Sequence, residues 1–312
     1  MAINTKTIKR RMKSITNTKK ITKAMELVSA AKMRKAVEAA LRTRSYARLA
    51  QELMARLSSA DQTKISLLER RPVEKILFVV VTSNRGLCGS FNTNMLKKMI
   101  VTLQHKERLA ENKHSDVACD MIGIGKKSVM IAKKTGLNLT ALFDRVSERP
   151  TFADLLPVFR MTLDGFLQKT YDKVYIAYTD YRSSLAQEPR IRQLLPVSPA
   201  DIETMIQTAG PNQKEDERHT AVEHIDLEQY LFEPDMTGIL NAILPRLVET
   251  QLYQAVLESS ASEHSARMVA MKSASDAAGD MLQELRLSFN KARQAAITRE
   301  ISEIVGGAAA LE

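Results

Sequence analysis

Both ends of the 312-residue chain carry apolar repeats too long for a compact domain to contain. Residues 3–57 hold neither proline nor glycine, and apolar side chains recur there at helical spacing. From His264 to Ala296 the spacing alternates strictly between four and three residues. The positions of this repeat are His264, Met268, Met271, Ser275, Ala278, Leu282, Leu285, Phe289, Ala292 and Ala296. Such a period predicts a left-handed coiled-coil seam.

The N-terminal stripe is less regular than the C-terminal one. Its predicted seam is Ile8, Met12, Ile15, Ile21, Met25, Val28, Met33, Ala36 and Ala40, continued by Ala47, Ala50, Met54 and Leu57. Helices of ~55 and ~70 residues would reach roughly 80 and 105 Å. The C-terminal one should begin near Thr237, with Pro245 either kinking it or marking its first turn. The two rods most simply pair with each other, antiparallel; separate coils with other chains are the alternative.

The middle of the chain alternates strand-like and helix-like stretches. The predicted strands are 76–81, 117–124, 139–143 and 173–181, and the predicted helices are 92–111, 126–134 and 152–167. This order predicts an α/β fold with a mostly parallel, Rossmann-like three-layer sheet. Residues 208–226 are polar and contain glycine and proline, which is typical of a loop or insertion.

Four parts follow from these patterns. We expect an N-terminal coiled-coil helix at 1–60, a central α/β domain at 70–207, a polar insertion at 208–233 and a C-terminal coiled-coil helix at 234–312.

The positive charge is concentrated in one element. The chain has a formal net charge of +10, while residues 1–50 hold 14 Lys and Arg against Glu26 and Glu38. The N-terminal helix should therefore meet an acidic partner, either nucleic acid or an acidic protein surface. No run of 18 apolar residues is present. Cys88 and Cys119 are too few for a disulfide framework or a four-ligand zinc site, and we interpret them as reduced thiols.

Two glycine-containing stretches could be taken for phosphate loops. In TSNRGLCGSFN (82–92), Gly86 and Gly89 are too close for GxxxxGK[ST], and no Lys-Ser or Lys-Thr follows. In GIGKKS (123–128), Lys127 stands where that pattern requires a hydroxyl residue. Both stretches are predicted to be tight strand-to-helix turns.

Catalytic and metal-binding constellations are not recognisable either. A nucleophilic Cys88 would need a base, and no motif ties any of the five histidines to it. His219 and His224 lie in the polar segment without metal-ligand spacing. We predict no catalytic residue, no metal and no cofactor.

Four stretches resemble the gamma subunit of the F-type ATP synthase, in that family's order and over nearly the whole chain. They are NTKKITKAMELVSAAKMRKA (17–36), SNRGLCGSFN (83–92), ARMVAMKSASDAA (266–278) and NKARQAAITREISEIVGGAAAL (290–311). The resemblance implies a non-catalytic rotor. Its coiled coil would turn inside a ring of three alpha and three beta subunits. Its α/β domain would rest, with the epsilon subunit, on the membrane ring of c subunits, coupling proton flow to ATP synthesis.

The resemblance also implies contact residues. Met25, Lys32, Arg34, Lys35, Arg293 and Gln294 would face the beta subunits. Arg85, Leu87, Cys88, Tyr230, Phe232 and Glu233 would belong to the foot, near epsilon and the c ring. The chain would be attached peripherally to the cytoplasmic face of the bacterial inner membrane through the complex.

Two other interpretations stay open on the sequence. A basic coiled-coil protein that binds nucleic acid would explain the charged helix, although that helix has no interleaved aromatic residues. A nucleotide-handling enzyme with helical arms would require a complete phosphate-binding motif, which the two glycine stretches do not provide.

Overall fold

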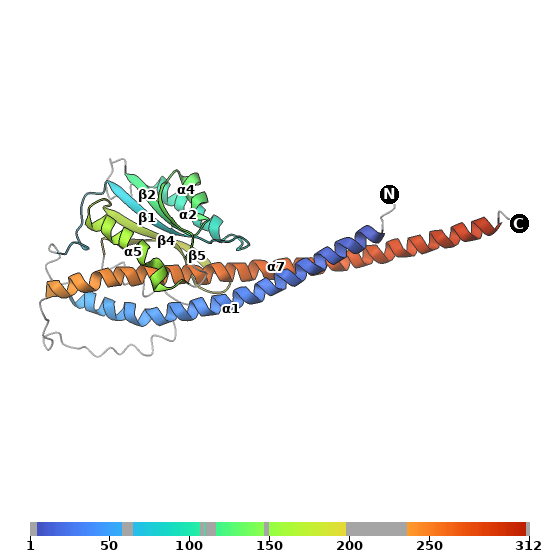
Figure 1. The fold of residues 1–312 in the computed structure, drawn as a ribbon, viewed down its shortest axis with the longest axis horizontal. Coiled ribbons are helices and arrows are strands. Elements are labelled where there is room, and N and C mark those ends of the chain that lie inside the picture. Colours follow the sequence, from blue (N-terminus) through green and yellow to red (C-terminus); the bar gives the residue numbers. More distant parts are fainter. Residues whose placement is uncertain are drawn as a thin grey trace. The chain divides into compact units, whose positions relative to one another are not determined.

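The computed structural model describes residues 5–57, 65–106, 109, 117–146, 150–197 and 236–309 (Figure 1). The chain divides into two compact units. The first combines Met1–Ser29 with Arg267–Glu312, and the second is Ala30–Ala266. The four predicted domain boundaries stay predictions, and the predicted insertion at 208–233 lies outside the described residues.

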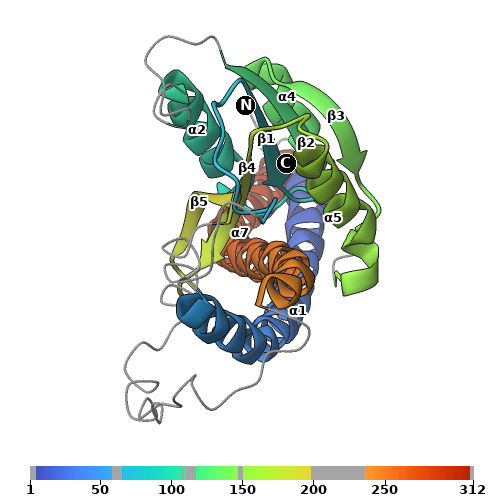
Figure 2. The same ribbon diagram turned by 90° about the vertical axis from the view of Figure 1, so that its left-hand side faces the viewer.

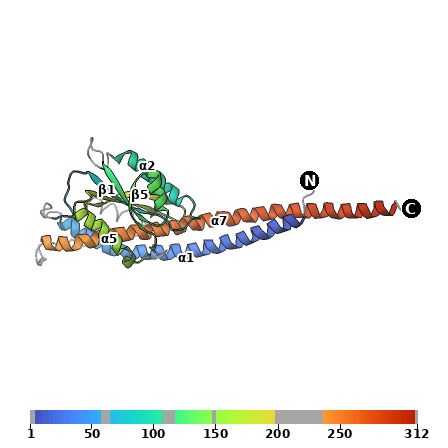
Figure 3. The same ribbon diagram turned by 45° about the horizontal axis from the view of Figure 1, so that its top comes forward.

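Two terminal helices dominate the secondary structure, as the repeats predict. Helix α1 spans Thr5–Leu57, with 53 residues, and α7 spans Met236–Ala309, with 74 residues. Pro245 lies inside α7, so the expectation that it marks the first turn is wrong. In the first unit the two helices lie side by side and run in opposite directions (Figure 3).

The α7 face of this coiled coil follows the predicted heptads. Met271, Ser275, Ala278 and Leu282 are buried, and Leu285, Phe289 and Ala292 are half-buried. Ala296 is exposed. Lys19 lies against Gly279, and counting fourteen residues outward from each of these reaches Thr5 and Arg293. Ala296 therefore lies beyond the first described residue of α1, which explains its exposure.

Among residues 5–42 of α1, whose side chains are described, the seam differs from the prediction at two positions. The side chains of the predicted seam residues Ala47, Ala50, Met54 and Leu57 lie outside the described part. Ile21 and Val28, both expected in the seam, are 60% and 54% exposed. Their neighbours Thr22 and Ser29 are buried instead. With Ile8 and Ile15 these form a seven-residue repeat that matches the period of α7.

A hydroxyl can occupy such a seam when the helix backbone satisfies it. The Thr22 hydroxyl donates to the Thr18 and Lys19 carbonyl oxygens, both at 3.1 Å. The repeat therefore continues through side chains that an apolar pattern does not reveal.

The second unit contains a five-stranded sheet in the order β3-β2-β1-β4-β5. The strands are β1 Lys75–Val81, β2 Ala118–Ile124, β3 Asn138–Phe143, β4 Lys173–Tyr181 and β5 Gln187–Leu195. The first four pair in parallel, which confirms the predicted fold class. Strand β5 pairs antiparallel with β4 and was not predicted. Its Pro189, Arg190 and Arg192 are typical of an edge strand and hide the strand pattern.

Helices cover both faces of the sheet. Buried residues of α2 (Phe91–Gln104) and α4 (Ser128–Thr135) pack with Ile76, Phe78 and Val80 of β1. Leu77, Val79 and Val81 face the other way, toward α5 (Phe152–Leu167) and the first part of α7. Figure 2 looks along α7 and shows it on one side of the sheet. From Leu240 to Val256, α7 is thus part of the α/β core.

Candidate functional site

The loop after β1 is a hydrogen-bonded turn. The Ser83 amide donates to Asn92 Oδ1 at 3.2 Å, and the Ser83 hydroxyl donates to the Arg85 carbonyl oxygen at 2.7 Å. The Asn92 amide in turn donates to the Ser83 hydroxyl at 2.7 Å. The first turn of α2 is thereby fixed to the end of β1, as the sequence predicts for a strand-to-helix turn.

Cys88 is buried at the centre of this turn, only 3% exposed. Its sulfur lies 3.2 Å from the Asn92 amide nitrogen and 3.7 Å from the Ser83 hydroxyl oxygen. Its third neighbour is the Arg85 carbonyl oxygen at 3.9 Å. These groups are neutral, so they provide no base for a thiolate nucleophile, and the arrangement is one of packing.

The second glycine loop packs against the first. The amides of Lys126, Lys127 and Ser128 donate to Asn84 Oδ1, the Ser83 carbonyl and the Gly125 carbonyl at 2.9, 3.1 and 3.1 Å. A phosphate cradle would need such amides aimed at the ligand. Since protein acceptors already occupy them, this loop is not a phosphate site.

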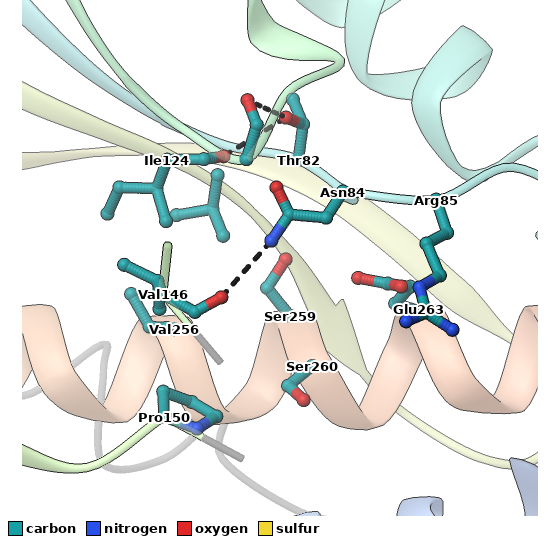
Figure 4. Close-up of a pocket in the computed structure, with 12 residues that line it drawn as sticks. Thr82, Asn84, Arg85, Ile124, Val146, Pro150, Val256, Ser259, Ser260 and Glu263 are labelled. Carbon is teal, nitrogen blue, oxygen red and sulfur yellow. Dashed lines mark hydrogen bonds between the residues drawn. The ribbon is translucent and has the colours of Figure 1, made fainter. Parts of the chain in front are cut away.

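A small cavity of about 40 Å³ lies where these loops meet α7 (Figure 4). Val81, Ile124 and Val256 contribute apolar lining, and Arg85 and Glu263 also line it. The Ser259 hydroxyl, buried in its wall, has no hydrogen-bonding partner among the described residues. The volume suits a few water molecules rather than a nucleotide.

The cavity also locates part of the predicted foot set. Arg85 lines this cavity together with Ser259 and Glu263 of α7. These two α7 residues lie more than 20 residues after Met236, where the helix begins. Leu87, which has a positive φ of 63°, is 61% exposed. Tyr230, Phe232 and Glu233 lie outside the described residues.

The predicted beta-facing residues lie along the two terminal helices. In the first unit Met25 is half-buried, and Arg293 and Gln294 are exposed. In the second unit Arg34 and Lys35 are exposed, while Lys32 is half-buried. Of the cationic side chains in this set, Arg34, Lys35 and Arg293 are thus exposed and Lys32 is not.

One feature escaped the sequence analysis, the turn between β4 and β5. Leu185 at its tip is 83% exposed. The turn is held to α7, because the Ser265 hydroxyl donates to the Ser184 carbonyl at 2.7 Å. The turn is also joined to α1, because the hydroxyl of Tyr181, the last residue of β4, donates to the sulfur of Met33 on α1 at 3.7 Å. A lone leucine in the polar stretch RSSLAQE was the available signal.

Buried charges brace the sheet at both ends of its strands. Burial would raise the pKa of Asp120, but hydrogen bonds from Asn138, Lys75 and Tyr171 outweigh it and lower that pKa. At the other end, burial raises the pKa of Asp180 even though Arg182 and Arg190 approach it within 3.1 and 3.2 Å.

Two further observations limit the chemistry of the described residues. Within them, no group of three or more His, Cys, Asp or Glu side chains could hold a metal ion. Across the same ranges, no helix is long and apolar enough to cross a membrane.

Known proteins match the chain from end to end. A family model described as ATP synthase covers residues 4–311. The ATP synthase gamma chain of Chloroflexus aurantiacus is 42% identical over 308 residues, which cover 97% of each chain. The gamma chain of Legionella pneumophila is 37% identical over 307 residues, covering 98% of this chain and 99% of that one.

Solved structures show the same fold. A chain of the Euglena gracilis mitochondrial ATP synthase, in a structure titled OSCP/F1/c-ring, superposes with a TM-score of 0.60 at 21% identity. That match covers 98% of this chain and 94% of the other. A chain of the Tetrahymena thermophila central stalk and c-ring gives 0.52 at 23% identity, over 82% and 99%. With the full-length sequence matches, these findings show that the chain belongs to the ATP synthase gamma chain family.

Proposed function

We infer that the chain is the central-stalk rotor subunit of a proton-translocating ATP synthase and carries no catalytic site of its own. The observation that carries this conclusion is the family match over residues 4–311. The pairing of α1 with α7 in the first unit gives the chain a shaft element. The occupied amides after β2 and the neutral surroundings of Cys88 agree with a part that transmits force rather than performs chemistry.

The shaft would turn inside three alpha and three beta subunits. Met25, Arg293 and Gln294 in the first unit, and Lys32, Arg34 and Lys35 in the second, would meet the beta subunits. Support comes from the exposure of Arg34, Lys35, Arg293 and Gln294, which leaves them accessible to carboxylates. Rim charges of this kind contribute more to orientation and association rate than to affinity.

The α/β domain would form the foot, in contact with epsilon and the c ring. Leu87 and Arg85 would make such contacts directly, since Leu87 is exposed at the turn. Buried Cys88 would act by holding the turn. Tyr230, Phe232 and Glu233 complete the proposed set on the basis of the resemblance alone. Through this complex the chain would be peripheral to the cytoplasmic face of the bacterial inner membrane.

Purification of the tagged chain from its native membranes tests the function. We expect alpha, beta, epsilon and c subunits to co-purify, together with ATP hydrolysis that depends on the beta subunits. The matched control is the same chain carrying Leu282→Asp in the coiled-coil seam, which should recover less of the alpha and beta subunits. Recovery of nucleic acid without any ATP synthase subunit would contradict the proposal and favour the nucleic-acid alternative.

A further inference from the structure

The turn between β4 and β5 presents its leucine from a fixed backbone. The Ser183 hydroxyl accepts from the Leu185 and Ala186 amides at 3.3 and 3.1 Å. The Ala186 carbonyl accepts from the Arg182 and Ser183 amides at 3.2 and 3.0 Å. Leu185 therefore projects from a turn whose conformation is set before any partner arrives.

Side chains on three elements hold the turn in place. Gln187 Nε2 donates to the Ser184 carbonyl at 3.0 Å and to the Ser265 hydroxyl at 3.3 Å. The Ser262 hydroxyl on α7 donates to the Thr179 carbonyl of β4 at 3.1 Å. With the Tyr181–Met33 contact, the hairpin is joined to both terminal helices within the second unit.

A fixed, exposed apolar side chain is unfavourable in water and favourable in an interface. Association is weakened by the loss of side-chain and loop freedom, and a turn that is already ordered loses little. Leucine alone covers a modest area, so it suits a single apolar hollow rather than a broad groove.

The charges around the turn indicate what borders that hollow. The α1 segment 30–42, which meets the hairpin at Met33, holds Lys32, Arg34, Lys35 and Arg42 against one acid, Glu38. On the hairpin, Asp180 and Glu188 are ion-paired with Arg182 and Arg190. Next to Met33, Arg34 and Lys35 are exposed cations, and carboxylates on the partner would complement them.

We propose that Leu185 is an anchor that inserts into an apolar hollow rimmed by carboxylates on a subunit of the alpha–beta ring. This contact rests on the proposed function and adds the β4–β5 hairpin to the surface of α1. One docking site would then combine a central apolar contact with a cationic border. In a rotor, such a contact can transmit force from the sheet as well as from the helices.

The test measures the dissociation rate of the full chain from a purified alpha–beta assembly of the same organism. Leu185→Ala should dissociate roughly ten-fold faster than the unsubstituted chain. Leu185→Asp should dissociate faster still, whereas Leu185→Lys should recover part of the loss, because its charge matches the carboxylate rim. Leu167→Asp, an exposed leucine at the end of α5, is the matched control and should change nothing.

The outcomes separate the two proposals. If the unsubstituted chain binds tightly and Leu185→Asp dissociates no faster than Leu167→Asp, the anchor is overturned while the rotor function stands. Equal losses for the Asp and Lys variants would overturn the carboxylate rim. Failure of the unsubstituted chain to bind the assembly at all would overturn the rotor function and, with it, the anchor.

Discussion

Lys19 of α1 lies across Gly279 of α7, with its Nζ 2.9 Å from the point that a Cβ on Gly279 would occupy. The pair adjoins buried Thr22 and Ala278, so it marks the register of the coiled coil in the first unit. The nearby atoms are the far end of a flexible side chain, Nζ and Cε. A glycine at this point is therefore not required by close packing.

Gly279→Ala should stabilise the first unit. Glycine inside a helix is less favourable than alanine by about 0.5–1 kcal/mol, and moving the end of Lys19 offsets only part of that gain. Amide hydrogen exchange of residues 267–309 in the full chain would report slower exchange. Gly307→Ala is the control, because a Cβ at Gly307 meets nothing within 4 Å. It measures the effect of replacing a helical glycine by alanine where no side chain has to move. A faster exchange in Gly279→Ala would show that Lys19 is held rigidly.

The corrected seam of α1 predicts opposite effects at adjacent positions. Ser29→Lys should cost several kcal/mol, because it places an ammonium group where 3% of the side chain is exposed. Val28→Lys, at a position that is 54% exposed, should cost less than about 0.5 kcal/mol. Thermal unfolding of the two full-length variants distinguishes them. Equal losses of stability in the two variants would mean that the seam of α1 runs through Ile21 and Val28, as the apolar pattern predicted.

Pairing of the two terminal helices can be tested through α7 alone. Leu282→Asp should remove exchange protection from both α1 and α7 in the first unit, because Leu282 is buried in their seam. Met281→Asp is the matched control, since Met281 is 53% exposed. The sheet of the second unit has its own core and should keep its protection. Loss confined to α7 would mean that α1 is not its partner.

Periodicity predicted the parts of the fold that repeat. Strict heptads located the α7 seam, and alternating strand and helix patterns located the four parallel strands. The same reasoning misplaced Ile21 and Val28, because burial followed the seven-residue repeat through hydroxyl side chains that look polar. It missed β5, whose arginines and proline suit an edge strand but not an apolar alternation.

Contacts between distant residues could not be predicted in the same way. The Lys126 and Lys127 amides meet Asn84 and Ser83, acceptors more than 40 residues away in sequence, so only the fold shows that they are occupied. Leu185 likewise becomes notable only once its turn is seen to be fixed to α7. The proposed shaft contacts would in turn depend on other subunits, whose surfaces this sequence does not encode.

Asp120 should make stability depend on acid. Its folded pKa lies below that of the unfolded chain, so the ionised group stabilises the fold above the unfolded value of about 4, and this contribution is lost as the pH falls through the folded pKa. Asp120→Asn should lose about 1–2 kcal/mol at pH 7. The difference in unfolding free energy between this variant and the unsubstituted chain should narrow below pH ~4. Denaturant unfolding at about pH 7 and about pH 3 measures this difference.

The control for Asp120→Asn is Asp144→Asn. Asp144 lies 3.8 Å from Lys126 with its side chain 40% exposed, so its loss should be small at either pH. If the difference in unfolding free energy between Asp120→Asn and the unsubstituted chain is the same at about pH 7 and about pH 3, the ionisation of Asp120 does not contribute to stability.

Cys88 should be dispensable for turnover and slow to react. Cys88→Ala removes a buried sulfur, and with it a weak acceptor 3.2 Å from the Asn92 amide, so we expect a stability loss of about 1 kcal/mol. ATP hydrolysis and proton pumping by the assembled complex should stay within about two-fold of normal, since no neighbouring base makes this thiol a nucleophile. A maleimide should label half-buried Cys119 before Cys88 in the folded chain. Rapid labelling of Cys88, or loss of hydrolysis in a Cys88→Ala complex that still assembles, would return this residue to the list of catalytic candidates.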